Sequence, residues 1–472
     1  MPPAESRLAV PAPSSDSSSS KAHFQAVYQG LVSFLTRRAG NADQQRGGHL
    51  RRSAAGDGFD RMPTVTAAQG SPRAWRVRVG LVLFHRWAGL VLAGFLLVAG
   101  LTGSLLAFHD ELEAALSPSL WRVVPPAPQA APLDPLTLRT RVQAAYPHAH
   151  VRMAPLHAEA GRALVYSLEA QPDADQVFVN PYTGEILGDR LWGDITQGHK
   201  NLVPFIYRLH YSLALGTRGS YVLGVLALLW TLDCLVGAIL TFPPRPAGRS
   251  SGSSKTWPVR WWAAWKIRRG SSRYKLNVDL HRAGGLWTWA MLFTIAWSSV
   301  AFNLSEVYSP VMKAVFAHQV EAESGHGPAQ PNPTPALDWY AARETGRRLM
   351  SAQAQAHGMA LFQEELLFHD PQRNVYRYLV KSNRDIRDRI GSTSITFDAD
   401  TGVLQAGWLP TGAASGDTIR TWITSLHMAA VWGLPMKLFV CTMGLVVGML
   451  SITGVVIWAR KRDARRGPRS RS

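Results

Sequence analysis

Residues 82–107 read VLFHRWAGLVLAGFLLVAGLTGSLLA, a run in which Arg86 is the only formally charged side chain. The hydrocarbon core of a bilayer is roughly 30 Å thick, and a helix that rises about 1.5 Å per residue crosses it in about 20 residues. This run is long enough and apolar enough to do so. We therefore predict a transmembrane helix within residues 81–108 and a membrane protein.

Three further apolar runs follow at residues 221–242, 286–304 and 438–459. We expect them to lie in transmembrane helices within the segments 209–242, 281–304 and 423–459, the first and last of which begin with a short interfacial helix. Asp233 is the single acid in the second run. Because an intramembrane acid is usually paired or functional, we expect a lysine or arginine partner near the cytoplasmic end.

Basic side chains predict the orientation, because they are retained in short cytoplasmic segments. The formal net charge is +18, and three basic segments flank the spans: residues 73–78, the loop 243–280 and the tail 460–472. The long connections 110–208 and 305–422 hold most of the acids, so we expect them to be exported. The basic segments border spans, which predicts contact with membrane lipid and argues against nucleic-acid binding.

Other features limit what the chain contains. Residues 1–75 are rich in Ser, Ala, Gly and Pro, which predicts a disordered N-terminal extension. No apolar stretch follows Met1, so no cleavable signal peptide is expected, and Met62 is a second candidate start. The only cysteines, Cys234 and Cys441, lie within predicted spans, which excludes a disulfide framework in the exported loops.

The chain carries an internal duplication. HRWAGL at residues 85–90 resembles HRAGGL at residues 281–286, and LH precedes the second and fourth spans at His210 and His427. The offset of 217 (427 − 210) also relates Gly216 to Gly433 and Gly237 to Gly454. We predict two parallel repeats, each made of a span, a small α+β domain and a span, related by an axis along the membrane normal.

The exported loops repeat as well. FVNPYTGEILG at residues 178–188 resembles TFDADTGVLQAG at residues 396–407, and both predict a strand, a tight Thr-Gly turn and a second strand. Before each motif lies a predicted helix, at residues 135–146 and 337–357, and a predicted strand, at residues 163–169 and 374–381. Each loop should therefore fold as an α+β domain.

Four histidines occupy equivalent positions in the repeats. His85 and His281 open the first and third spans, whereas His210 and His427 precede the second and fourth. A two-fold axis brings equivalent residues face to face, and a low-spin haem requires two imidazoles on opposite faces of its ring. We therefore predict b-type haem, one or two per chain, held by His85 with His281 and by His210 with His427. The absence of a Cys-x-x-Cys-His motif makes the haem non-covalent.

Neighbouring residues fit this hypothesis, and alternatives stay open. Arg86 and Arg282 match the geometry of haem propionates. His109 is an alternative iron ligand, a substrate contact or a solvated interfacial side chain. Each histidine could instead be an interfacial side chain at the lipid headgroups with no ligand role. A different metal, with Asp or Glu as additional ligands, is a further alternative.

HRWAGL at residues 85–90, LHYSLALG at 209–216, LHMAAVWG at 426–433 and the duplicated Thr-Gly motifs resemble the PepSY-associated transmembrane proteins. The resemblance covers roughly residues 80–460. It implies two exported PepSY-like domains and placement in the inner membrane of a Gram-negative bacterium. Some members are iron-regulated ferric-siderophore reductases with haem between their helices, which matches His85, His281, His210 and His427.

The resemblance implies a haem-containing electron-transfer protein that reduces a ferric siderophore or another iron chelate. Reduction releases iron because Fe(II) binds hard oxygen ligands less tightly than Fe(III). The sequence has no Gly-x-Gly-x-x-Gly after a strand, no Walker A motif and no Cys-x-x-Cys, so the electron donor should be a separate quinol or reductase. The rival interpretations are a non-enzymatic PepSY binding or regulatory protein and a siderophore or metal transporter.

Overall fold

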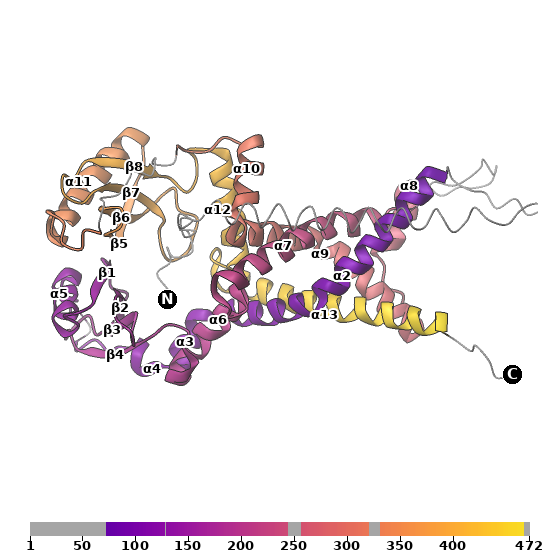
Figure 1. Cartoon of the computed structure of the whole chain (residues 1–472), viewed down its shortest axis with the longest axis horizontal. Coiled ribbons are helices and arrows are strands. Elements are labelled where there is room, and N and C mark those ends of the chain that lie inside the picture. The colour runs from indigo at the N-terminus through magenta and orange to yellow at the C-terminus, as the bar shows by residue number, and fades with distance from the viewer. Residues whose placement is uncertain (1–71, 128, 244–255, 321–330, 467–472) are drawn as a thin grey trace, which may run out of the picture.

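The computed structural model describes residues 72–127, 129–243, 256–320 and 331–466. Within these described residues, four helices are long and apolar enough to cross a membrane: α2 (Pro72–Leu106), α7 (Gly216–Thr241), α9 (Arg273–Asn303) and α13 (Gly433–Arg466). They correspond to the four predicted spans and form one bundle (Figure 1). Most of the predicted disordered extension 1–75, part of the loop 243–280 and the end of the tail 460–472 lie outside the described residues.

Small residues let two of the bundle helices approach closely. Helix α2 packs against α13, and α7 packs against α9. A Cβ atom at Gly100 of α2 would lie only 2.6 Å from the carbonyl oxygen of Gly444 on α13. At the same crossing, the Ser104 hydroxyl donates to the carbonyl oxygen of Cys441 at 2.9 Å. Helix association in a membrane relies on such close packing and interhelical hydrogen bonds, so this crossing should fix α2 against α13.

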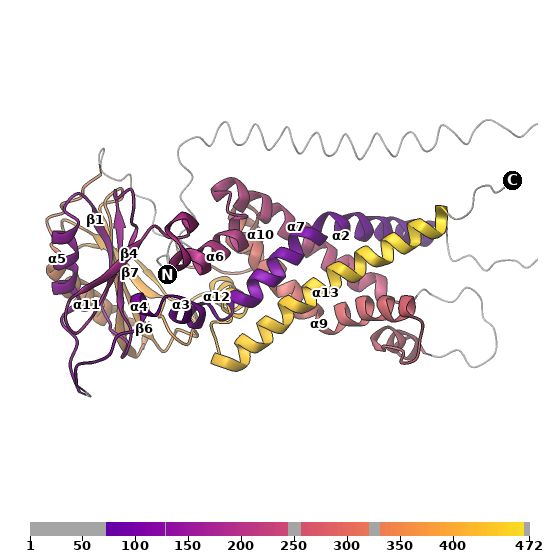
Figure 2. The same ribbon diagram turned by 90° about the horizontal axis from the view of Figure 1, so that it is seen from below.

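The two long connections lie at the same end of the bundle, which we call the sheet end (Figures 1 and 2). The opposite end, called the α8 end, carries α8 (Trp257–Trp262) and η3 (Ala263–Trp265). The first connection holds α3 (His109–Leu116), α4 (Pro118–Trp121), α5 (Pro135–Ala145), β1 (His150–Pro155), β2 (Leu164–Glu169), β3 (Gln176–Val179), β4 (Ile186–Arg190), η1 (Ile195–Gln197), η2 (His199–Asn201) and α6 (Leu202–Ser212). The second holds α10 (Ser305–Val315), α11 (Trp339–His357), β5 (Leu361–Asp370), β6 (Val375–Ser382), β7 (Thr393–Asp398), β8 (Leu404–Trp408) and α12 (Ser415–His427).

The predicted elements of the two connections are confirmed, and local chemistry explains them. Helices α5 and α11 begin after Asp134 and Asp338, whose carboxylates accept hydrogen bonds from backbone amides of the first helical turn. The Thr-Gly turns join β3 to β4 and β7 to β8, and Gly184 and Gly402 have φ values of +76° and +71°. Such backbone conformations favour glycine because it has no Cβ.

The two connections share one sheet, which the sequence does not predict. Its eight antiparallel strands run in the order β4-β3-β2-β1-β5-β6-β7-β8, so β1 pairs with β5 at the middle. The expected two separate α+β domains are therefore joined. Pairing removes two exposed strand edges, which would otherwise be free to associate with other chains. Helices α5 and α11 cover the face of the sheet turned away from the bundle (Figure 2). The hydrophobic core beneath them contains residues of both connections.

Short helices α6 and α12 lead from the sheet into α7 and α13. Gly216 and Gly433 are the first residues of the two spans and have φ values of +59° and +57°. Leu213 and Trp432, just before them, are also left-handed. The chain bends at these glycines, and the bends place the ends of α6 and α12 beside the bundle.

Candidate functional site

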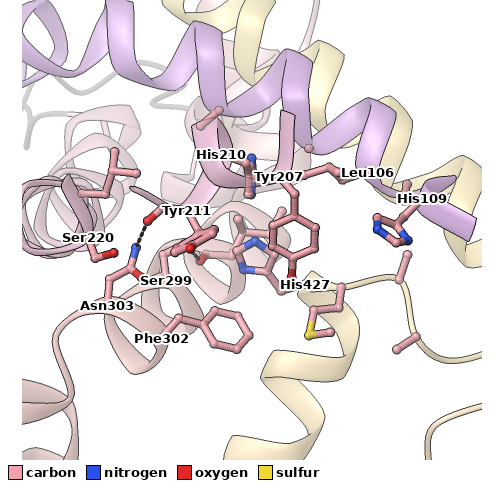
Figure 3. A pocket seen from close by; sticks show the side chains of 18 of the residues that line it. Leu106, His109, Tyr207, His210, Tyr211, Ser220, Ser299, Phe302, Asn303 and His427 are labelled. Atoms are coloured by element: carbon pink, nitrogen blue, oxygen red, sulfur yellow. Dashed lines mark hydrogen bonds between the residues drawn. The ribbon is translucent and has the colours of Figure 1, made fainter. Parts of the chain in front are cut away.

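The structure brings the four repeat-related histidines together in two pairs. His85 of α2 and His281 of α9 form the inner pair, with ring centroids 6.1 Å apart. His210 of α6 and His427 of α12 form the outer pair, with ring centroids 6.2 Å apart. Figure 3 shows His210 and His427 approaching one another from different helices. Each pair combines one histidine from each half of the chain, as the duplication predicts.

Hydrogen bonds at Nδ1 orient both outer histidines. His210 Nδ1 lies 2.9 Å from the Thr102 hydroxyl, and His427 Nδ1 lies 2.7 Å from the Ser298 hydroxyl. In a neutral imidazole, a proton on Nδ1 that is donated to the hydroxyl would leave the Nε2 lone pair for ligation.

The inner histidines are oriented in the same way by different partners. His281 Nδ1 lies 3.1 Å from both the Leu450 carbonyl oxygen and the Thr453 hydroxyl. His85 Nδ1 lies 2.9 Å from the Asp233 carboxylate. The expected lysine or arginine partner of Asp233 is thus wrong: the partner is a histidine of the candidate site. The sequence does not reveal this contact, because Asp233 and His85 are far apart in the chain and meet only when α7 packs against α2.

Glycines allow the histidine rings to approach neighbouring helices. A Cβ atom at Gly103 would lie 3.1 Å from the ring of His210, and one at Gly454 would lie 3.1 Å from the ring of His281. At Gly237 the corresponding distance to His85 is 3.4 Å. Gly237 and Gly454 are related by the offset of 217, so the duplication includes this packing. Larger side chains at these positions would press on the rings.

A cavity of about 850 Å³ opens beside the outer pair and extends from the bundle to the sheet. Its deeper part is lined by apolar side chains, including Leu92, Leu96 and Trp230, with His210 and His427 alongside. This volume lies in the range of cofactor and ligand sites, which are mostly apolar with few polar groups.

The part of the cavity toward the sheet is polar. Charged residues Arg152, Glu169 and Asp175 line it. The buried Ser167 hydroxyl and the buried Gln176 amide nitrogen line it as well, and neither atom has a hydrogen-bond partner. We call this region the polar chamber.

His109 lies apart from the two pairs. Its Nδ1 atom is 3.0 Å from the Asp110 carboxylate, and its ring packs edge-on against Tyr207. The Nε2 atom is buried without a hydrogen-bond partner, and the residue lines the cavity (Figure 3). Arg389 of the second connection pairs with Asp110, which links the two connections near the cavity mouth.

The two predicted propionate contacts have different surroundings. Arg282 is held by Asp279 at 3.0 Å and by the carbonyl oxygen of Ala263 at 3.1 Å. Arg86 is half-buried and has no ion pair with another described residue. A propionate could pair with Arg86 directly, whereas Arg282 would have to share its guanidinium with Asp279.

Comparison with known proteins identifies the family. The model of the PepSY-associated TM region matches residues 82–461. The chain belongs to this family. A search of curated proteins finds no match.

In this PepSY-associated membrane protein, the described residues contain no cluster of three or more His, Cys, Asp or Glu side chains that could hold a bare metal ion. Each histidine pair supplies two imidazoles, the number of axial positions on a haem iron. An imidazole–metal bond is about 2 Å long, so an iron held between two rings separates their centroids by roughly 6 Å. The measured separations fit this requirement.

Sequence reasoning missed the residues that orient the histidines. Thr102 and Ser298 lie 17 residues after His85 and His281 on the same helices (102 − 85 = 17; 298 − 281 = 17). A hydroxyl at the same spacing in both repeats is the signal that could have found them. Nothing comparable signals Asp233, because its counterpart at the offset of 217 is Leu450.

Proposed function

We propose that this protein is a haem-containing electron carrier that reduces a ferric chelate at the sheet end. The observation that carries the proposal is the spacing of both histidine pairs, 6.1 and 6.2 Å between ring centroids, with every Nδ1 atom hydrogen-bonded. This arrangement supports b-type haem at both sites, with Nε2 as the ligating nitrogen. Bound haem would supply one-electron chemistry.

The proposed orientation places the sheet end outside the cytoplasm of a bacterial inner membrane. Its support is the basic composition at the α8 end, where the described chain includes Lys266, Arg268, Arg273 and Lys275, and the last turns of α13 add further arginines. In this orientation the two parallel repeats cross the membrane in the same sense, and the two PepSY-like halves of the sheet are exported.

Different side chains have different roles in this proposal. The four histidines hold the two haems, and their hydrogen-bond partners fix the ring orientation. The inner and outer pairs are separated by roughly 25 Å along α2, since Thr102 lies 17 residues beyond His85 (102 − 85 = 17). This distance covers most of the hydrocarbon core, so electrons would enter near the α8 end or from quinol.

The polar chamber would hold the electron acceptor. Ser167, Gln176 and Arg152 line the chamber, and Arg152 is paired with Glu169 at 3.0 Å. Hydroxamate and carboxylate oxygens of a ferric siderophore or another iron chelate are acceptors that such donors match. Reduction of the bound iron weakens its hold on hard oxygen ligands and so releases it. The electron donor would be a quinol or a separate reductase.

The test uses the full chain in lipid vesicles, with a ferric trihydroxamate chelate, a water-soluble quinol and a dye specific for Fe(II). We expect haem absorbance bands that the quinol reduces, and Fe(II) formation that falls at least tenfold in His427→Ala. Protein without haem bands would contradict the proposal and favour a binding or regulatory module. Haem that is reduced by the quinol but does not pass electrons to the chelate would contradict the reductase assignment.

A further inference from the structure

The four candidate ligands differ in the group that accepts their Nδ1 proton. Three of them have neutral partners: Thr102 for His210, Ser298 for His427, and Leu450 with Thr453 for His281. His85 alone faces a carboxylate, that of Asp233. The hydroxyl partners of His210 and His427 match across the repeats. Those of His85 and His281 do not, because Asp233 and Val236 stand where the other repeat has Leu450 and Thr453.

Asp233 lies where a charged side chain is energetically unfavourable. The residue is only 8% exposed and lies within the span α7. Acids inside membrane spans are rare because their charge is poorly solvated there, and they usually mark a function. In the other repeat the equivalent position is Leu450, which shows that the helix packing itself does not require a carboxylate there.

We propose that Asp233 is a positioning residue that lowers the redox potential of the inner site below that of the outer site. The inference rests on the proposed haem function. A hydrogen bond to a carboxylate is stronger than one to a hydroxyl and makes the ligating imidazole more basic. A more basic ligand favours Fe(III) over Fe(II), and the nearby negative charge acts in the same direction.

The resulting order of potentials gives electron flow a direction. His85 with His281 and His210 with His427 would hold the two haems, which would supply one-electron chemistry. A donor would pass one electron at a time to the inner site, and the order of potentials would favour its transfer to the outer site. Because the outer site holds the electron more tightly, transfer toward the polar chamber is favoured and return is opposed.

The test is a potentiometric titration of the full-length haem-loaded protein. His427→Ala serves as the background, because it should retain only the inner haem. In this background, Asp233→Asn should increase the ratio of reduced to oxidised inner haem at least tenfold at a fixed ambient potential, a shift of about 59 mV for one electron. Asp233→Glu, which keeps the carboxylate, should stay closer to the native value than Asp233→Asn.

A matched control is Thr231→Val. Thr231 is a buried polar residue of α7 whose hydroxyl donates to the Ala227 carbonyl oxygen on the same helix. Its loss should leave the potential unchanged. If Asp233→Asn fails to retain haem, Leu450→Asp provides an independent reading, because a carboxylate added beside His281 should lower the inner potential further.

The outcomes separate this inference from the proposed function. An inner haem whose potential is unchanged or lower in Asp233→Asn would overturn the role of Asp233 while leaving the haem sites in place. An unchanged or higher potential in Leu450→Asp would do the same. Native protein that binds no haem would instead overturn the proposed function on which the inference rests.

Discussion

At the residue scale, the positions of the four histidines could be predicted, but their hydrogen-bond partners could not. Repeat symmetry alone indicates that His85 should face His281 and that His210 should face His427, since equivalent residues meet at a two-fold axis. The partners depend on how helix faces rotate when they pack. Asp233 shows the limit most clearly, because nothing in the repeat pattern connects it with His85.

The hydroxyl of Ser298 should govern haem retention at the outer site. It lies 2.7 Å from His427 Nδ1, so Ser298→Ala removes the group that orients this ligand. Loss of such a partner typically costs 10–100-fold in metal affinity. We expect haem transfer to apomyoglobin from the outer site to accelerate at least tenfold. Thr294→Val, which removes a hydroxyl bonded within α9, is the control; equal transfer rates in the two variants would refute the role.

A second histidine contact predicts a pH effect on the sheet. His369 of β5 is fully buried, and its Nδ1 atom lies 3.1 Å from Nε2 of His150 on β1. Burial, together with the positive charges of His150 and Arg139, lowers the pKa of His369 to about 4. The unfolded chain has a histidine pKa near 6.5, so between these values the unfolded state binds more protons.

Stability of the sheet should therefore fall as the pH drops from about 6.5 toward 4 and should not change from this source above 7. His369→Gln should reduce that slope by at most about 1.4 kcal/mol per pH unit. Hydrogen exchange of the β1 and β5 amides as a function of pH measures the effect. Identical slopes in native protein and variant would show that His369 does not carry it.

At the scale of elements, the helices, strands and Thr-Gly turns of the sheet end were predictable from local sequence patterns. Asp134 and Asp338 mark the starts of α5 and α11, and the two Thr-Gly turns mark the hairpins. The joining of β1 to β5 was not predictable, because register between distant strands depends on three-dimensional packing rather than on local pattern. Helix ends also differ: α9 begins at Arg273, well before the apolar run, because a helix can continue beyond the bilayer into polar sequence.

The seam between β1 and β5 can be tested by a designed disulfide. Ala154 and Leu367 are directly opposite one another in the antiparallel pair. Such residues have Cβ atoms about 4.5–5.5 Å apart, close to what a disulfide requires. Ala154→Cys with Leu367→Cys should form an internal disulfide after mild oxidation, detected by altered gel mobility that a reductant reverses.

The control pairs Ala154→Cys with Ser394→Cys. Ser394 lies on β7, three strands from β1 in the sheet order. Strands are about 4.8 Å apart, so these two residues are too distant for a disulfide. Absence of cross-linking at Leu367, or equal cross-linking at Ser394, would contradict the shared sheet.

At the scale of the whole molecule, the described part of the chain forms a bundle of four long helices with one eight-stranded sheet at one end. The apolar runs and the family both indicate a multi-pass membrane protein. The orientation remains a prediction from the distribution of arginine and lysine. Reporter fusions at about residues 160 and 350, one in each connection, should be active only in an exported compartment. Cytoplasmic activity at either position would refute the orientation.

The central claim is that two histidine pairs, each built from both halves of the chain, hold two haems. Haem content per chain in native protein and in four single alanine variants tests it most directly. Native protein should contain two haems. His85→Ala and His281→Ala should each lose the same inner haem, and His210→Ala and His427→Ala should each lose the same outer haem. Full haem content in His85→Ala and His427→Ala would contradict the account.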